Sequence, residues 1–312
     1  MPSWFRGPLH SSPKQGIRSS PVTRFRFVKG HGTENDFVLL PDPDGTAYPA
    51  LSADVIRRLT DRHAGIGADG VIRVVRSEFE DEPKAVAEDA EWFMDYRNAD
   101  GSIAEMCGNG IRVMARYLWE SGLASTPVVA LATRGGIRTV HTDRTGAITV
   151  EMGTARPASS RVQSFVRVGD RQWPATPVSV PNPHAVVFVD DLDEPGRLIE
   201  PPTVKPSSVF PEGANVEFVV PRGQQHIAMR VWERGVGETR SCGTGVCAAA
   251  WAAIRRDGVG RGLTYRVDVP GGTLEVAERP DGVLLLTGPA VLGVSGSVEL
   301  PGKAEAGRAS VT

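Results

Sequence analysis

Two short segments of this 312-residue chain repeat one pattern of cysteine and glycine. CGNGI at residues 107–111 matches CGTGV at residues 242–246. Flanking landmarks keep the same spacing, because a polar residue, Asn98 or Glu233, lies nine residues before the cysteine of each segment. Ordered matches of this kind indicate duplication of one structural unit. The repeat therefore predicts two similar domains, and ~150 residues is an ordinary domain length.

Each repeated segment opens a predicted helix. The two helices cover residues 112–121 and 247–257, and each is followed by a glycine, the usual residue just past a last turn. Asn109 and Thr244 stand where a helix N-cap belongs. Residues 246–254 are apolar on every side of a helix. That pattern predicts that protein surrounds the second helix on all sides.

Short segments that favour β-structure, bounded by Gly and Pro, surround both helices. They are residues 25–28, 71–75, 148–152, 162–168, 216–220, 227–232, 263–269 and 283–286. The economical fold is of the α/β (α+β) class, with two pseudo-symmetric domains. Each domain would be a curved, mostly antiparallel sheet or barrel around a central buried helix. We expect one domain over residues 24–151 plus 289–312, a second over 152–288, and a disordered N-terminal extension over 1–23.

Composition excludes several classes of protein. The formal net charge is -2, and no basic run indicates a nucleic acid or a membrane surface as partner. The longest strongly apolar run, residues 246–254, is far shorter than the ~20 residues that span a bilayer. Three cysteines are too few for a disulfide scaffold in a chain of this length. Reduced thiols and a cytoplasmic location are the simpler interpretation.

The two repeated cysteines have a pattern suited to acid–base chemistry. A thiol at a helix N-terminus is exposed to unpaired N–H groups and the helix dipole, which can lower its pKa to ~3.5–7.5. The following glycines let a carboxylate approach the same N–H groups. Pseudo-symmetry would place Cys107 and Cys242 on opposite sides of one bound molecule. A thiolate could then remove a proton from one face of a carbon while a thiol delivers one to the other.

Other interpretations of the cysteines are weaker. A single helix-start cysteine is usually a small buried residue, and Cys247 within the apolar helix fits that description. Cys242 and Cys247 could be half of a zinc site, but the other half is missing, so no metal is expected. No lysine lies in a phosphate-binding Gly-rich loop that would suggest pyridoxal phosphate, and no G-x-G-x-x-G opens a βαβ unit. These features predict a mechanism without a cofactor.

Seven motifs in this order resemble those of the diaminopimelate epimerase family. They are GHGTENDF at 30–37, GIGADG at 65–70, YRNADGS at 96–102, MCGNG at 106–110, PNPH at 181–184, GANV at 213–216 and ERGVGETRSCGTG at 233–245. The last motif is highly specific, and the shorter ones gain weight as an ordered set. The resemblance covers roughly residues 24 to 300.

The resemblance implies an isomerase that interconverts LL-2,6-diaminopimelate and meso-diaminopimelate without a cofactor, in lysine and peptidoglycan precursor biosynthesis. It implies that Cys107 and Cys242 are the catalytic acid/base pair of a two-base proton transfer. It also implies that His184 and Glu233 modulate the pKa values of the thiols. The residues implied to bind substrate are Asn35, Asn98, Gly108, Asn109, Asn182, Asn215, Glu233, Arg234, Gly243 and Thr244. Asp36 and Arg112 could equally be structural.

At two positions this chain departs from the family pattern, and the family's properties at those positions cannot be assigned to it. Gly70 stands where many members have a substrate-lining Gln, so that contact is either absent or supplied by another residue. Val294 stands where some members have an aromatic residue linked to dimer contact. The resemblance implies a homodimer, in which this aromatic contact would be absent.

Other functions stay open at this point. Proline and hydroxyproline racemases share the fold and the use of two thiols. Their sequences around the two cysteines differ from this chain at Asn109 and at 233–241. Isomerases of this fold that lack the cysteine pair are disfavoured by the two cysteines. An amino-acid binding protein without catalysis would leave two matched thiols unexplained. A thiol–disulfide redox protein would predict activity with dithiol donors and no change of stereochemistry.

Overall fold

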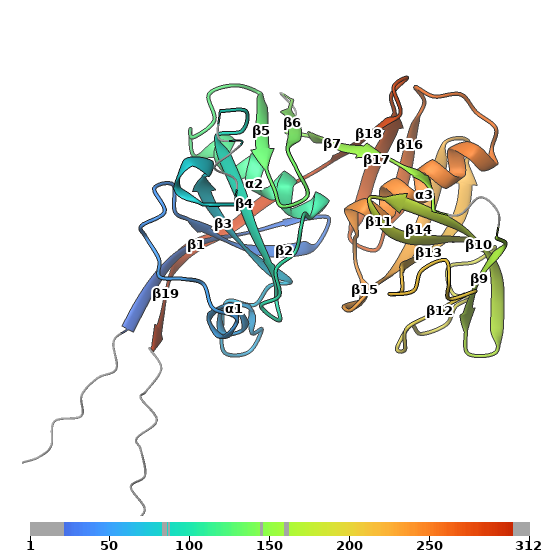
Figure 1. Ribbon diagram of the computed structural model, residues 1–312, viewed down its shortest axis with the longest axis horizontal. Helices are drawn as coiled ribbons and strands as arrows, with labels where there is room; N and C mark the ends of the chain where they lie inside the picture. Colours follow the sequence, from blue (N-terminus) through green and yellow to red (C-terminus); the bar gives the residue numbers. More distant parts are fainter. Residues whose placement is uncertain (1–21, 83–85, 87, 144–145, 159–161, 302–312) are drawn as a thin grey trace, which may run out of the picture.

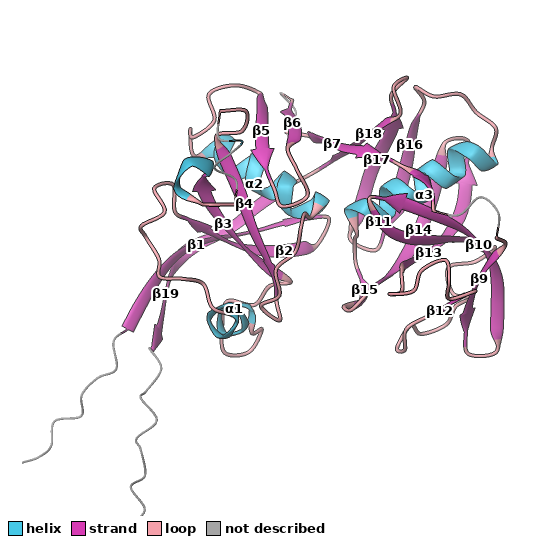
Figure 2. Ribbon diagram, viewed as in Figure 1, coloured by secondary structure: helices cyan, strands magenta, loops and turns pink. Residues whose placement is uncertain are grey.

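The computed structural model describes residues 22–82, 86, 88–143, 146–158 and 162–301. These residues form two halves that lie side by side, each with one helix at its centre and strands wrapped around it (Figure 1; Figure 2). The expected extension over 1–23 lies almost entirely outside the described residues, and the described chain enters its first strand at Val22. Residues 302–312, assigned above to the first domain, also lie outside the described residues.

Among the described residues, the first half begins with β1 (Val22–Gly32), β2 (Asn35–Pro41), α1 (Ala53–Thr60), β3 (Gly70–Arg76), the short 3-10 turn η1 (Ser77–Phe79), β4 (Trp92–Asn98), α2 (Gly108–Glu120), β5 (Val128–Ala132), β6 (Arg138–Thr142) and β7 (Ile148–Thr154), in this order. The helix α1 begins at the N-cap Ser52 and was not predicted. It lies below the strands of this half in the view of Figure 1.

The second half follows as β8 (Arg156–Pro157), β9 (Ser164–Val168), β10 (Arg171–Val180), β11 (Asn182–Phe188), β12 (Thr203–Lys205), β13 (Asn215–Gly223), β14 (His226–Glu233), β15 (Gly237–Thr239), α3 (Gly243–Arg256), β16 (Thr264–Val269), β17 (Gly272–Glu278) and β18 (Val283–Gly288). The last strand, β19 (Val291–Pro301), returns to the first half and pairs with β1.

The order of strand pairings is the same in both halves. In the first half, β1–β2 is antiparallel, β2–β3 parallel, β3–β4 antiparallel and β4–β5 parallel, and β5–β6–β7 is antiparallel. In the second half, β10–β11, β11–β13, β13–β14, β14–β16 and β16–β17–β18 repeat that sequence of directions. The α+β fold with two pseudo-symmetric units, inferred from the repeated cysteine segments, is therefore confirmed.

Two strand pairings determine how the halves connect. β7 pairs with β18, so the final strands of the two repeats join the halves edge to edge. β19 then crosses back along β1 (Figure 1). The division into 24–151 plus 289–312 and 152–288 stays a prediction, and this path is the reason for assigning the C-terminal strand to the first unit.

The central helices are buried for the reason that their sequences indicate. Every residue of α3 from Gly243 to Ile254 is buried, as are nine residues of α2. Gly122 and Gly258 follow the two helices with φ of 71° and 64°, the left-handed conformation that ends a helix at little cost to glycine. One apolar cluster runs through both halves and includes both helices. The helix starts are therefore held rigidly where the halves meet.

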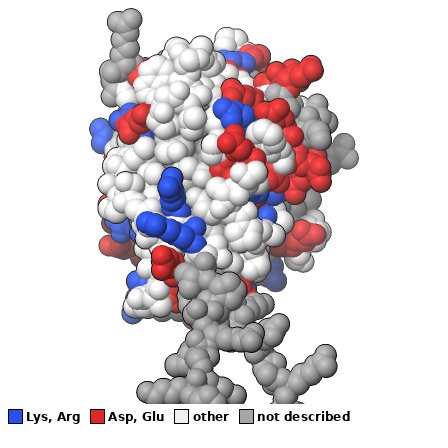
Figure 3. Space-filling view, turned by 90° about the vertical axis from the view of Figure 1, so that its left-hand side faces the viewer, with Lys and Arg blue, Asp and Glu red and all other residues white. Residues whose placement is uncertain are grey.

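The described part of the chain contains no helix that is both long and apolar enough to cross a bilayer. On the end of the molecule shown in Figure 3, acidic side chains gather at one side and a few basic ones lie apart from them.

Candidate active site

The two repeated cysteines are themselves the N-cap residues of the central helices. α2 begins at Gly108 and α3 at Gly243, and Cys107 and Cys242 precede them with extended φ/ψ of −136°/117° and −128°/114°. The prediction that Asn109 and Thr244 are the N-caps is wrong. Both lie inside the first turn, because the glycine that follows each cysteine already has helical geometry.

The two helix starts touch each other. A methyl group added at Gly243 would lie 3.0 Å from Cα of Gly108, tighter than ordinary carbon contacts. Glycine is therefore needed at this crossing, because any side chain would push the helices apart. Since each glycine directly follows its cysteine, the crossing brings the two thiol-bearing residues to one place between the halves.

A cavity of about 190 Å³ opens at this crossing. It is smaller than the ~300–1,000 Å³ typical of pockets for drug-sized ligands, so it restricts the site to a small molecule. A larger hollow of about 850 Å³ beside α1 contains neither cysteine. The lining of the small cavity includes every residue predicted to bind substrate or to transfer protons: Asn35, Asn98, Cys107, Gly108, Asn109, Asn182, Asn215, Glu233, Arg234, Cys242, Gly243 and Thr244. His184 lies directly behind Asn182.

The Cys107 thiol meets a backbone donor and a side-chain acceptor. The Gly110 N–H donates to its sulfur at 3.4 Å, and the thiol in turn points toward Asn35 Oδ1 at 3.7 Å. Asn109 Nδ2 donates to the same Asn35 oxygen at 3.1 Å and to the Ser241 carbonyl at 3.0 Å. Asn109 therefore links the Cys107 loop to the residue before Cys242.

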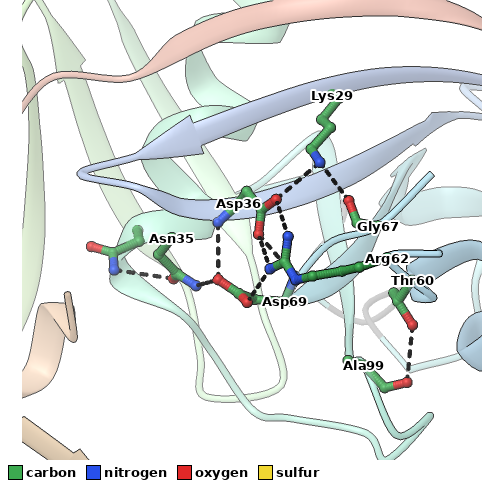
Figure 4. A network of polar contacts seen from close by, with 9 residues as sticks. Lys29, Asn35, Asp36, Thr60, Arg62, Gly67, Asp69 and Ala99 are labelled. Carbon is green, nitrogen blue, oxygen red and sulfur yellow. Dashed lines mark hydrogen bonds and ion pairs between the residues drawn. The ribbon is translucent and has the colours of Figure 1, made fainter. Parts of the chain in front are cut away.

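A polar network behind Asn35 fixes the orientation of its amide (Figure 4). Asn35 Nδ2 donates to Asp69 Oδ2 at 2.8 Å, and Arg62 pairs with both Asp69 and Asp36. Burial alone would raise the pKa of Asp36, but hydrogen bonds and charges from Arg62 and Lys29 lower it to about 2. Asp36 is thus part of the support for Asn35 and does not line the cavity.

The Cys242 thiol lies at the end of a longer series of hydrogen bonds. Its sulfur is 3.5 Å from Thr244 Oγ1, which accepts a bond from Asn182 Nδ2 at 3.2 Å. Asn182 Oδ1 is 2.9 Å from His184 Nε2. His184 Nδ1 is 2.7 Å from a carboxylate oxygen of Glu217, a residue that the sequence analysis did not single out.

Glu233 is the other acid beside Cys242. Thr239 Oγ1 donates to its carboxylate. Burial raises the pKa of Glu233, while the bonds from Thr239 and Cys242 act in the opposite direction. Burial first, and then the charge of Glu233, raise the pKa of the Cys242 thiol well above its usual value. The carboxyl and the thiol are therefore close enough for each to affect the other's proton.

Lowered pKa values were predicted for both thiols, and for this state of the protein that prediction is wrong. Burial raises the pKa of Cys107 to about 11, and the helix-start N–H groups of Gly110 and Asn109 offset only part of this rise. Cys242, 7% exposed, is shifted in the same direction. The cost of removing a thiolate from water exceeds the stabilisation from the helix N-terminus.

The remaining predicted residues line the same cavity. Asn98 Nδ2 donates to Ser102 Oγ at 3.0 Å, and Asn215 Oδ1 accepts the backbone N–H of Arg234 at 2.8 Å. The half-exposed Arg234 guanidinium makes polar contacts only with Glu212 among the described residues, 3.7 Å from its carboxylate and 3.4 Å from its carbonyl oxygen. It is therefore available to a carboxylate that enters the cavity.

Tyr96 occupies the position that was left open at Gly70. A methyl group added at Gly70 would lie 2.6 Å from the Tyr96 ring and 3.1 Å from its hydroxyl. Tyr96 lines the cavity. Burial, followed by the charges of Cys107 and Glu233, raises the pKa of Tyr96 well above its usual value. The phenol therefore stays a neutral donor that faces the cavity.

Arg112 is buried beside the contact between the two helix starts. It is 0% exposed, and its guanidinium donates to the carbonyl of Gly108 at 3.4 Å and to Thr33 Oγ1 at 3.3 Å. Thr33 Oγ1 lies 2.7 Å from Ser241 Oγ. Burial lowers the pKa of Arg112 to about 10. This arginine therefore ties the first helix start to the segment that leads into Cys242.

Comparison with solved structures relates the fold to known enzymes. A hydroxyproline epimerase from Agrobacterium vitis matches with a TM-score of 0.62 at 15% identity, over 90% of this chain and 94% of that one. A phenazine biosynthesis protein of the PhzF family from Bacillus anthracis matches with a TM-score of 0.61 at 17% identity, over 89% and 99%. At these identities the likeness establishes the fold alone.

Sequence comparison is more specific. The chain is 54% identical to a diaminopimelate epimerase of Streptomyces coelicolor over 89% of this chain and 96% of that protein. It is 48% identical to a diaminopimelate epimerase of Thermobifida fusca over 88% and 98%. These relatives place the chain among the amino-acid epimerases, which are isomerases. The family model for diaminopimelate epimerase matches residues 27–157 and 176–293, and the chain belongs to that family.

Proposed function

We propose that this protein interconverts LL-2,6-diaminopimelate and meso-diaminopimelate by proton transfer between two cysteines. The observation that carries the proposal is the crossing of the helix starts. Cys107 and Cys242 cap two helices whose first glycines touch, and both open on one small cavity. Membership of the diaminopimelate epimerase family supports the choice of substrate.

The proton transfer balances without any other reagent. One cysteine, as thiolate, takes the proton from the α-carbon, and the electron pair of the broken C–H bond delocalises into the substrate carboxylate. The other cysteine, as thiol, gives its proton to the opposite face of the carbon. The product has the inverted configuration, and the two sulfurs have exchanged protonation states. The reverse reaction uses the same pair with their roles exchanged.

The helix starts stabilise the charge that develops in this step. As the first residues of α2 and α3, Gly108, Asn109, Gly243 and Thr244 have backbone N–H groups with no partner within their own helix. A carboxylate held there gains negative charge as the α-proton leaves, and fixed donors stabilise that charge without rearranging. The step therefore needs no cofactor to act as an electron sink.

The outer part of the cavity suits the second amino-acid end of the substrate. Arg234 can bind the distal carboxylate through its planar fork of donors. Asn side chains offer donors and acceptors, and Tyr96 offers the hydroxyl that replaces a side chain at residue 70. We assign substrate binding to these groups together with Asn35, Asn98, Asn182, Asn215 and Glu233.

The raised thiol pKa values require a way to form the thiolate inside the cavity. Glu233 serves this purpose, because its carboxylate interacts with the Cys242 thiol and its own pKa is raised by burial. A proton can pass from the sulfur to this carboxylate at smaller cost than to water. His184 contributes through Asn182 and Thr244, which lie between its ring and the sulfur.

We place this activity in the cytoplasm, in the synthesis of lysine and of peptidoglycan precursors. All three cysteines are free, and the reaction requires that Cys107 and Cys242 remain reduced. Nucleic acid and membranes are not expected as partners. A homodimer through the β1–β19 edge is part of the proposal, and Val294, 62% exposed on β19, would be covered by it.

The test is to incubate the purified protein separately with LL-diaminopimelate, L-proline and L-glutamate, followed by chiral analysis of each product. We expect rapid formation of meso-diaminopimelate and no racemisation of the other two. Turnover of proline at a comparable rate, or no turnover of diaminopimelate by folded and fully reduced protein, would contradict the proposal.

A further inference from the structure

A buried acid–histidine pair lies behind the first turn of α3. Glu217 on β13 and His184 on β11 are both 0% exposed, and they share a hydrogen bond of 2.7 Å. The Glu217 carboxylate packs against Gly245, where a methyl group would lie 2.8 Å from its oxygen. Its second oxygen, Oε2, has no hydrogen-bond partner among the described residues.

The repeat gives a direct comparison for this pair. On β2 and β3, Phe37 pairs with Gly70, and on β11 and β13, His184 pairs with Asn215. Phe37 is thus the counterpart of His184, and two residues further along the neighbouring strand, Ile72 is the counterpart of Glu217. Phe37 and Ile72 pack against Gly110 of α2, as Glu217 packs against Gly245 of α3. The same framework therefore folds around an apolar pair.

Stability alone gives no reason for the polar pair. Burying a carboxyl is costly unless it is fully hydrogen-bonded, and Glu217 leaves one oxygen unpartnered. Replacing a buried pair of this kind by apolar residues of similar size is often neutral or stabilising. Burial raises the pKa of Glu217, and His184 opposes that rise.

The contacts of the pair define where its protons lie. His184 has an oxygen acceptor on each side, Glu217 at Nδ1 and Asn182 Oδ1 at Nε2. Either His184 donates from both nitrogens to a carboxylate and an amide, or a protonated Glu217 donates to Nδ1 while Nε2–H donates to Asn182. In both arrangements the pair is neutral overall, and Nε2–H faces Asn182.

The direction of the His184–Asn182 hydrogen bond determines the direction of the next bonds toward the Cys242 thiol. Because Asn182 accepts through Oδ1, its Nδ2–H points to Thr244 Oγ1 at 3.2 Å. Thr244 then accepts from Asn182 and has its own hydroxyl proton free for the Cys242 sulfur at 3.5 Å. A donor at that sulfur favours the thiolate form.

We propose that Glu217 is a positioning residue for the Cys242 thiol, acting by holding His184 with Nε2–H toward Asn182, so that Thr244 donates to the sulfur. This inference deepens the proposed function and rests on it for its effect on turnover. The titratable groups that face Glu217 are His184 from β11, Glu233 from β14 and Cys242 at the start of α3.

The experiment measures the thiols themselves as well as turnover. Full-length protein is alkylated with iodoacetamide over a range of pH, and modification at Cys107 and Cys242 is followed separately by peptide mass spectrometry. Glu217→Ile reproduces the apolar counterpart in the first half. We expect it to raise the pH midpoint for Cys242, to leave Cys107 unchanged, and to lower kcat by roughly tenfold to a hundredfold, the range found when the outer partner of a metal-bound histidine is removed.

Glu217→Gln supplies the conservative rescue. Its amide can still donate to Nδ1, so the Cys242 midpoint should stay near that of the unmodified protein, and kcat should recover to within a few-fold. Glu278→Gln is the matched control, because Glu278 is also buried but pairs with Arg255 and Arg261 at the other end of α3. It should lower the melting temperature and leave both thiol profiles unchanged.

Several results would overturn the positioning role. An unchanged Cys242 midpoint in Glu217→Ile would do so, as would equal changes at both cysteines. A downward shift would mean that Glu217 acts through charge alone. The unmodified protein could also fail to turn over diaminopimelate while its Cys242 midpoint still depends on Glu217. That result would contradict the proposed function and leave the positioning role standing.

Discussion

The starts of α2 and α3 have matched backbones and different surroundings. Each has an extended N-cap cysteine followed by a glycine that touches its counterpart. Behind Cys107 lie Phe37 and Ile72, and Asn35 presents its amide oxygen to the thiol. Behind Cys242 lie His184 and Glu217, and Asn182 presents its amide N–H to Thr244.

This comparison separates what the framework needs from what the chemistry needs. The glycines, the N-cap geometry and the strand order recur because they bring the two sulfurs to one cavity. In the proposed two-base reaction, one sulfur must be a thiol while the other is a thiolate, so different surroundings at the two sulfurs are expected. The side chains beside the two sulfurs differ: an amide oxygen of Asn35 lies beside Cys107, whereas the Thr244 hydroxyl and the Glu233 carboxylate lie beside Cys242.

The largest expected effect tests whether the two thiols are equally necessary. Cys107→Ala and Cys242→Ala should each lower epimerisation by about 10²–10⁴-fold, because each removes one of the two proton-transfer groups. Chiral analysis of diaminopimelate measures the loss. Cys247→Ala, which removes the buried cysteine of α3 that does not line the cavity, is the control and should keep turnover. Substantial activity in either single variant would show that the reaction does not require both thiols.

Thiol reactivity should reveal what the two sites share. Burial raises both thiol pKa values, that of Cys107 to about 11, so the thiolate fraction stays small at neutral pH and increases as pH rises. At pH 7 we expect Cys107 to be alkylated roughly 300-fold more slowly than a free thiol with a pKa of ~8.5. Mass spectrometry of the alkylated peptides gives both rates. Midpoints below that of a free thiol would show that the helix N-termini outweigh burial.

A smaller effect should appear beside Gly70, where the two halves line the cavity with different side chains. The second half places Asn215 where the first has Gly70, and Tyr96 from the neighbouring strand fills that space. Tyr96→Phe should raise KM for diaminopimelate by about fivefold, since one hydrogen bond contributes about 1 kcal/mol. Tyr48→Phe, on the far side of the first half, is the control. An unchanged KM would remove Tyr96 from the substrate site.

The smallest effect should come from the network behind Asn35. Asp69→Ala removes the acceptor of the Asn35 amide, but this carboxylate is half-exposed and water can replace it. We expect turnover to fall only a few-fold and the melting temperature to change little, because exposed ion pairs contribute about 0–1 kcal/mol. Steady-state kinetics and thermal melting measure the two effects. A loss as large as that in Glu217→Ile would show that the exposed and buried supports are equivalent.

Much of this arrangement could be predicted because it is local in the sequence. The repeated cysteine and glycine segments gave the two units, the apolar run gave the buried helix, and the ordered motifs gave the lining of the cavity. Helix α1 was missed because it is short, charged and unrelated to the repeat. The N-caps were misplaced by two residues, because the preference of Asn and Thr for that position was given more weight than the cysteine that occupies it.

The parts that could not be predicted depend on burial and on contacts between distant strands. The direction of the thiol pKa shifts follows from how completely the cavity excludes water. Tyr96 occupies the space at Gly70 only because β3 and β4 pair in that register. Glu217 could have been noticed as an acid inside the apolar strand 216–220. Its contact with His184 requires the parallel pairing of β11 with β13.

The most direct test of two thiols acting on opposite faces is the reaction in D2O. LL-diaminopimelate is incubated with the protein, and substrate and product are separated and analysed by mass spectrometry at early times. The account predicts that each meso product molecule carries one deuterium at the inverted carbon while recovered substrate carries none, because one sulfur removes hydrogen and the other supplies solvent deuterium. Product without deuterium, or substrate labelled as fast as product forms, would contradict it.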